Sequence, residues 1–215
     1  MKTNFYRPTH VDTHEFDALL DIIRLEAQQI CNGGITSAED AVEYVSDLIS
    51  KQKILEKDQR MAFWGFDEPN HMPSDCRVIY FYIPTYYLTA AFLTLVVQYS
   101  DLLTQNSALI EPLQKALLGC TGRNFTGHGF ESFDGFLTAM NIFAAAPVAT
   151  FLERCPDLCP EFTALWRESD AELRDKLQSG EAGRIPDEWS GKPIDYTQRI
   201  SDIVAMIDES NRRFQ

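Results

Sequence analysis

The feature that most constrains the fold is an apolar stretch from Val78 to Ser100, 23 residues without a single Asp, Glu, Lys or Arg. Its length would be sufficient for a membrane-spanning helix. However, tyrosines and threonines interrupt it within 84–89, Pro84 divides it, and the sequence contains no second stretch of this kind. A single apolar helix with polar positions is typical of the buried centre of a helical domain. We therefore expect a buried helix over 84–104 and no association with a membrane.

Helical periodicity extends over most of the remaining chain. Apolar side chains recur at intervals of three and four residues, often after a capping Ser or Asp and before a glycine. The segment 77–83 is rich in β-branched and aromatic residues, but there is no second strand to pair with it, so a helical conformation is favoured there too. The expected helices begin near Asp12, Ser37, Pro84, Ser107, Ser132, Val148, Pro160 and Asp195.

This pattern predicts an all-α protein, with a single domain over 1–215. We expect about seven to eight helices, packed as antiparallel pairs around the buried helix 84–104. The helix after Ser132 is expected to end near Pro147, because proline interrupts helical hydrogen bonding. The segment 179–193 contains glycines and prolines and predicts a looser connection before the C-terminal helix.

The charge balance limits the partners of this protein. The sequence has 19 Lys and Arg against 32 Asp and Glu, a formal net charge of −13. This charge repels phosphate backbones and anionic lipids, so nucleic acid is not an expected partner. The first residues lack the apolar core of a signal peptide, and the five cysteines are irregularly spaced. Reduced thiols and a cytoplasmic location are therefore expected.

The densest group of unusual residues is a glycine-rich loop at 119–135, which contains five of the eleven glycines. Glycine clusters mark tight turns or a close approach of the backbone to another molecule. The loop carries polar side chains that could contact a ligand: Arg123, Asn124, His128, Glu131 and Asp134. The two carboxylates suit acid–base chemistry or cation binding better than phosphate binding, since they add negative charge at a helix start.

The same loop has a simpler explanation, which the sequence favours. Gly119 can end the preceding helix in a left-handed conformation, and the other glycines can form a sharp turn. The loop lacks the lysine of a phosphate-binding loop and follows a helix rather than a strand, so neither familiar nucleotide motif is present. Cys120 and His128 could form a thiolate–imidazole pair, but no motif fixes the distance between them.

Aromatic residues form a second candidate region. Trp64, in a loop predicted at 61–76, and Tyr86, in the central helix, belong to a group that could line an apolar pocket with polar tips. The favoured alternative is that these side chains fill the core. The sequence leaves open whether this loop and the glycine-rich loop share one pocket.

Metal and cofactor sites are not expected. His10 and His14 have a spacing that could present two imidazoles to one metal, but Asp12 caps the helix between them and no third ligand accompanies them. Cys155 and Cys159 lack a second pair of ligands at a usual zinc spacing.

Three classes of function follow from these observations. We favour a helical domain that binds a small molecule or a protein partner without chemistry of its own. The first alternative is an enzyme with an acid–base site in the loop 119–135. The second is a structural or regulatory subunit that acts through a helical interface, and the chain could assemble as a homo-oligomer.

Overall fold

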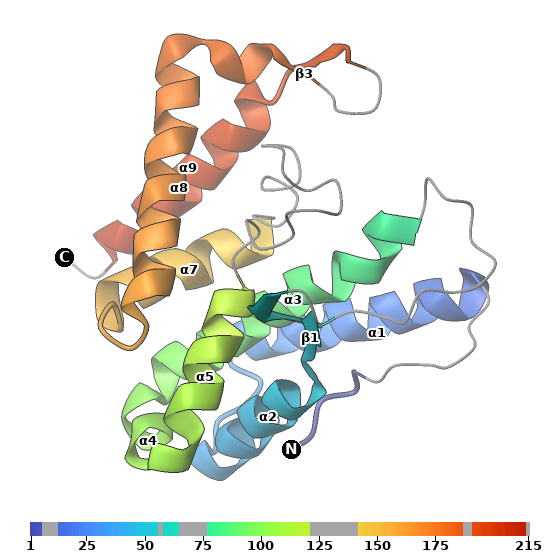
Figure 1. Cartoon of the computed structure of the whole chain (residues 1–215), viewed down its shortest axis with the longest axis vertical. Helices are drawn as coiled ribbons and strands as arrows, with labels where there is room; N and C mark the ends of the chain where they lie inside the picture. Colours follow the sequence, from blue (N-terminus) through green and yellow to red (C-terminus); the bar gives the residue numbers. More distant parts are fainter. Residues whose placement is uncertain (6–12, 56–57, 65–76, 121–141, 187–190, 214–215) are drawn as a thin grey trace. The chain divides into compact units, whose positions relative to one another are not determined.

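The computed structural model describes residues 1–5, 13–55, 58–64, 77–120, 142–186 and 191–213. The prediction of an all-α protein is confirmed: helices account for most of this part of the chain, which has only two small sheets of two strands each (Figure 1). The chain divides into two compact units, Met1–Cys120 and Thr121–Gln215. The single-domain organisation stays a prediction.

The first unit is built around α3. Residues 88–97 of this helix are buried, apart from the half-buried Thr94, and α3 packs against α1, α2 and α4. The expectation of a buried apolar helix is thus confirmed. Among the described helices, none is long and apolar enough to cross a membrane. The elements of this unit are α1 (Thr13–Cys31), α2 (Ala38–Lys51), β1 (Lys53–Leu55), β2 (Asp58–Phe63), α3 (Arg77–Gln98), α4 (Ser100–Gln105) and α5 (Ser107–Gly119).

The bounds of the central helix differ from the predicted ones. Helix α3 begins at Arg77, so Pro84 lies inside it rather than at its start, and Tyr99 separates it from α4. The helical conformation predicted for 77–83 is confirmed. Proline removes one backbone donor and so costs one helical hydrogen bond. Apolar residues that follow Pro84 in α3, among them Leu88, Phe92 and Leu93, are fully buried, and this burial outweighs the local cost.

The strand pair β1–β2 was not predicted. The two strands are antiparallel, with Lys53 opposite Phe63 and Ile54 opposite Ala62, and a register irregularity follows Ile54. The sequence shows helical periodicity over most of the chain and predicts no strand here. Strands of three and six residues are too short and too charged to display the two-residue alternation by which a half-buried strand is recognised.

The ends of the first two helices follow the predicted capping chemistry. Gly33 adopts a φ of +84° immediately after α1, a left-handed conformation that glycine adopts without strain. The Ser37 hydroxyl accepts a hydrogen bond of 3.0 Å from the backbone N–H of Asp40 and so caps α2. The left-handed glycine therefore marks the end of α1, and the capping serine marks the start of α2.

The second unit consists of three main helices and a short irregular connection. Helix α9 packs along α7 and along α8, and Figure 1 shows it running antiparallel to α8. Gly180, with a φ of +75°, ends α8. The elements are α7 (Ile142–Arg154), α8 (Pro160–Ser179), the 3-10 helix η2 (Glu181–Gly183), β3 (Ile185–Pro186), β4 (Pro193–Ile194) and α9 (Thr197–Arg212).

Helix α7 continues through a proline. We expected one helix to end near Pro147 and a second to cover 148–154, but the structure has one helix from Ile142 to Arg154 with Pro147 inside it. Apolar residues on both sides are buried, among them Ala144, Ala145 and Val148. As in α3, burial of the apolar face maintains the helix across the missing hydrogen bond.

A buried carboxylate fixes the N-terminal segment to the first unit. Glu26 on α1 is 6% exposed, and its Oε1 accepts hydrogen bonds of 2.6 Å from the hydroxyls of both Thr3 and Tyr44. Its Oε2 accepts a bond of 2.9 Å from the backbone N–H of Asn4. Phe5, the next residue, is buried in the core. Three donors therefore compensate the burial of one carboxylate.

This arrangement predicts a specific sensitivity to alkaline pH. Burial, and then the neighbouring Glu26 carboxylate, raise the pKa of Tyr44 above its ordinary value of 10. Above pH 10 the unfolded chain loses the Tyr44 proton whereas the folded protein retains it, so the free energy of unfolding falls as pH rises. The loss from this group approaches about 1.4 kcal/mol per pH unit.

Urea denaturation of the wild type and of Tyr44→Phe at pH 8 and pH 11 measures this effect. At pH 8 the variant is expected to be less stable by about 1–3 kcal/mol, because it lacks the hydrogen bond to Glu26. At pH 11 this difference is expected to narrow, since the variant has no phenol to titrate at this position. An equal loss of stability in both proteins would show that Tyr44 does not resist ionisation in the folded state.

Candidate functional site

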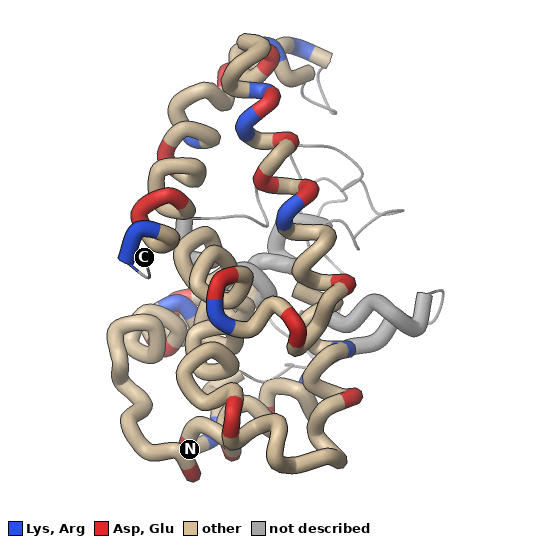
Figure 2. The backbone as a smooth tube through the Cα atoms, turned by 90° about the vertical axis from the view of Figure 1, so that its left-hand side faces the viewer, with Lys and Arg blue, Asp and Glu red and all other residues tan. Residues whose placement is uncertain are grey.

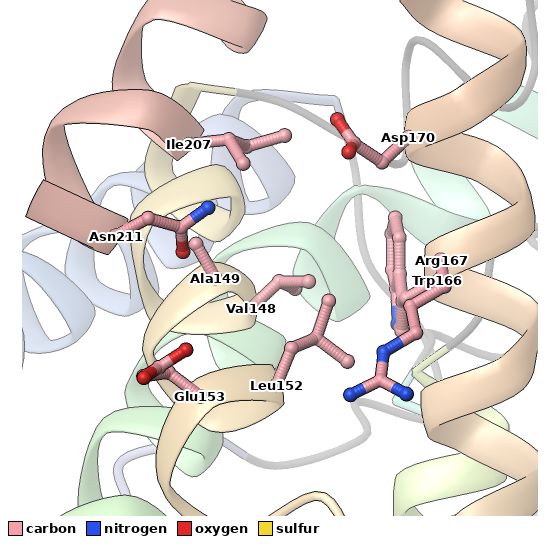
Figure 3. A pocket seen from close by; sticks show the side chains of 9 residues that line it. All are labelled: Val148, Ala149, Leu152, Glu153, Trp166, Arg167, Asp170, Ile207 and Asn211. Atoms are coloured by element: carbon pink, nitrogen blue, oxygen red, sulfur yellow. The ribbon is translucent and has the colours of Figure 1, made fainter.

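A pocket of about 300 Å³ lies within the second unit, among α7, α8 and α9 (Figure 3). Its inner part is apolar, and charged side chains lie at its rim. The lining side chains are Val148, Ala149, Leu152 and Glu153 of α7, Trp166, Arg167 and Asp170 of α8, and Ile207 and Asn211 of α9.

Aromatic side chains join α7 and α8 next to the pocket. Phe151 and Phe162 meet edge to face with ring centroids 4.9 Å apart, and Phe162 meets Trp166 in the same manner at 6.1 Å. Such pairs stabilise beyond the area they bury. Helix α9 packs against both helices. The remaining space between α7 and α8 forms the pocket, with Trp166 belonging both to the core and to the pocket wall.

One of the charged residues at the rim is neutralised within the protein. Both carboxylate oxygens of Asp170 lie 3.0 Å from Nε of Arg174, one helical turn further along α8. The same guanidinium donates to Asp208 of α9 at 2.8 Å. The hydrogen bonds to Asp208 and Asp170 raise the pKa of Arg174 above its ordinary value, so this cation keeps its charge. The cluster joins α8 to α9 beside the pocket.

Two other rim residues carry charges that no described residue neutralises. Glu153 of α7 and Arg167 of α8 are exposed, and neither side chain has an ion pair or hydrogen bond within the described residues. This separates them from most charged residues of α8 and α9, where acidic and basic positions are interspersed (Figure 2). Many of those pair along one helix, as Arg213 does with Glu209. Two opposite charges at one pocket are therefore available to a ligand.

The polar residues predicted from the glycine-rich loop lie outside the described part of the chain. This applies to Arg123, Asn124, His128, Glu131 and Asp134, and the side chain of Tyr86 lies outside it as well. Their role in ligand binding stays a prediction, as does a pocket shared by the loops 119–135 and 61–76. His10 and the side chain of His14 also lie outside the described part.

Trp64 lies in the core of the first unit. Its side chain is fully buried, and its ring contacts Phe92 of α3 with centroids 5.4 Å apart. The indole Nε1–H donates a 2.7 Å hydrogen bond to the carbonyl of Leu48. That carbonyl belongs to the last turn of α2, where carbonyls have no donor within the helix. The surroundings of Trp64 correspond to the structural alternative stated above, whereas its proposed contact with a ligand stays a prediction.

Three of the four described cysteines are buried thiols, and Cys31 is half-buried. Cys155 and Cys159 flank the connection between α7 and α8, and Cys120 follows α5, with its Sγ 3.3 Å from the carbonyl of Ala116. Burial raises the pKa of Cys31 and of Cys159, which disfavours the thiolate that nucleophilic catalysis requires. Among the described residues, no group of three or more His, Cys, Asp and Glu side chains is arranged to hold a metal ion.

None of the residues that line the pocket between α7, α8 and α9 was among the predicted site residues. Leu152 and Ile207 recur at helical spacing like any core residue, and Trp166 is buried on α8. The sequence does not show where neighbouring helices diverge, because this depends on tertiary packing. The one available signal is a pair of charged residues, Glu153 and Arg167, each next to an apolar lining residue.

Comparisons with protein-family models, with curated proteins and with solved structures found no match for this chain.

Proposed function

We propose that this protein binds a small organic molecule in the pocket among α7, α8 and α9, without chemistry of its own. The observation that carries the proposal is a pocket of about 300 Å³ whose lining combines buried apolar side chains with polar ones, including two charges that no described residue neutralises. Ligand sites are typically concave and mostly apolar, with a few polar groups that orient the ligand, and this volume lies at the lower end of their range. The ligand is therefore small.

The other two classes of function depend on residues outside the described part of the chain. The enzyme alternative depends on the polar side chains of 119–135, and the interface alternative depends on tyrosine side chains near the start of α3, such as that of Tyr86, which are not described although the helix itself is. Both stay predictions from the sequence. The pocket, in contrast, is formed entirely by described residues and can be tested directly.

Substitution of Ala149 tests the pocket. This residue is buried at the pocket wall, so Ala149→Leu is expected to extend an isobutyl group into the cavity (Figure 3). The added group displaces at least two methylene-sized groups of a ligand, each worth about 0.8 kcal/mol. The dissociation constant is then expected to rise about tenfold or more. Suitable probes are 3-phenylpropanamide and its charged relatives, titrated by isothermal calorimetry and ligand-observed NMR.

A matched control is available on the neighbouring helix. Ala164 of α8 is exposed and does not line the pocket, so Ala164→Leu is expected to bind the same probes as the wild type does. Circular dichroism and thermal unfolding establish that both variants fold. The proposal fails if no probe binds saturably to the wild type, or if Ala149→Leu binds every probe as well as the wild type.

A further inference from the structure

On the basis of the proposed small-molecule binding, we infer that the ligand is a zwitterion, with a small apolar body that carries both an ammonium and a carboxylate group. An amino acid with an apolar side chain is the simplest member of this class. The inference rests on which charges at the pocket are already neutralised, on which helices carry the others, and on the size of the cavity.

The charges at the rim differ in their availability. Asp170 is engaged by the guanidinium of Arg174, and that cluster is completed by Asp208. Among the charged side chains that line the pocket, Glu153 and Arg167 are the two without a partner within the described residues, one negative and one positive, whereas the cluster of Arg174 with two carboxylates keeps one net negative charge. A ligand that satisfies both must carry both signs.

The two available charges come from different walls of the pocket. Figure 3 shows the Arg167 guanidinium of α8 on the side of Leu152, and the Glu153 carboxylate of α7 on the side of Asn211 of α9. The planar guanidinium of Arg167 suits a carboxylate, to which it can donate two parallel hydrogen bonds. The carboxylate of Glu153 can accept from an ammonium group. The amide of Asn211, also in the lining, can donate to or accept from either group.

Ligands with a single charge complement this rim less well. An amine leaves Arg167 without an anion, and a carboxylate leaves Glu153 without a cation. When ligand binding displaces water from the rim, the charge left without a partner weakens binding. A zwitterion avoids this loss and adds no net charge to the pocket.

The interior of the pocket indicates the size and the apolar character of the ligand's body. Val148, Trp166 and Ile207 are buried and offer an apolar surface without a charge. At about 30 Å³ for each water-sized group, 300 Å³ holds about ten such groups. This corresponds to a body of the size of an apolar amino acid side chain together with its two charged groups.

Four compounds that share a phenyl body and differ in their charged groups test this inference. L-phenylalanine is the zwitterion, 2-phenylethylamine the cation, 3-phenylpropanoate the anion and 3-phenylpropanamide the neutral reference. Calorimetric titration of the full chain is expected to give a dissociation constant for L-phenylalanine about tenfold below those of the other three, the usual size of one charge-assisted hydrogen bond.

Variants at the rim separate the two contacts. Arg167→Gln is expected to weaken binding of L-phenylalanine and of 3-phenylpropanoate about tenfold, and to leave 2-phenylethylamine unaffected. Glu153→Gln is expected to weaken L-phenylalanine and 2-phenylethylamine and to leave 3-phenylpropanoate unaffected. Both residues are exposed, so folding should tolerate the changes. Glu161→Gln, an exposed position of α8 outside the pocket, is the control and should bind all four compounds as the wild type does.

The outcomes distinguish this inference from the proposed function. If an amine, an acid or the amide binds as tightly as L-phenylalanine, and Ala149→Leu weakens that binding, the zwitterion is excluded while the pocket function holds. The zwitterion is excluded as well if the rim variants change the affinity for all four compounds equally. If none of the compounds binds saturably, both proposals fail.

Discussion

Replacement of Trp64 by alanine is expected to lower the free energy of unfolding by about 3–5 kcal/mol, the usual cost of truncating a buried aromatic side chain. Trp64 is fully buried and packs against Phe92 of α3. Its indole also supplies the donor for the Leu48 carbonyl in the last turn of α2. The alanine variant therefore creates a cavity beside α3 and leaves a helix-end carbonyl without its donor. Urea denaturation followed by circular dichroism measures the change.

Trp64→Phe separates these two contributions. Phenylalanine retains most of the apolar contact with Phe92 but cannot donate to Leu48, so we expect a loss of about 1–3 kcal/mol. A Trp64→Ala protein with wild-type stability would contradict a structural role and would support the ligand contact predicted from the sequence. In that case the same variant should lose ligand binding while remaining folded.

The second large effect is expected at Glu26. Glu26→Ala removes the acceptor of three hydrogen bonds, from the hydroxyls of Thr3 and Tyr44 and from the N–H of Asn4. Each buried donor left without an acceptor costs about 1–3 kcal/mol, although relief from burying a charge offsets part of the sum. We expect a net loss of about 3 kcal/mol, together with faster amide hydrogen exchange in residues 3–5.

Glu26→Gln tests the same hydrogen bonds with a side chain of nearly the same shape and no charge. Its side chain has one oxygen where glutamate has two, so its NH₂ group must face one of the three donors, and we expect a loss of about 2 kcal/mol. Glu111→Ala on α5 is the matched control, because Glu111 is exposed; its effect should remain within about 0.5 kcal/mol. If Glu26→Ala resembled this control, the N-terminal segment would not depend on the buried carboxylate.

Much of the fold was predictable because its signals are local in the chain. The hydroxyl of Ser37 and the left-handed Gly33 fix helix ends, and the prediction is confirmed at both positions. The part of the uncharged stretch from 88 to 97 is buried as expected, apart from the half-buried Thr94. Proline was the misleading signal: Pro84 and Pro147 were expected to bound helices, yet both lie inside them. The cost of one missing hydrogen bond is local, whereas the burial that outweighs it is set by the tertiary structure.

The pocket could not be predicted for a different reason. Its apolar lining has the same residue types and the same spacing as the core, so Leu152 and Ile207 resemble packing residues in the sequence. Whether such side chains meet a neighbour or leave a space depends on how far α7 and α8 diverge. The contact of Phe151 of α7 with Phe162 of α8 is one of the tertiary contacts on which this depends, and the sequence does not show it. Periodicity identifies a buried face, but not what lies opposite it.

The turn between α7 and α8 also carries two thiols whose reactivity reports on opening of the pocket walls. Cys155 and Cys159 flank this turn, and they are only 8% and 4% exposed. An alkylating reagent reaches such thiols only in molecules in which the turn has opened. The rate at which they are alkylated therefore measures how often the turn between α7 and α8 opens. A molecule held between the walls would make those events rarer, so occupancy of the pocket could be followed by mass spectrometry without a label on the ligand.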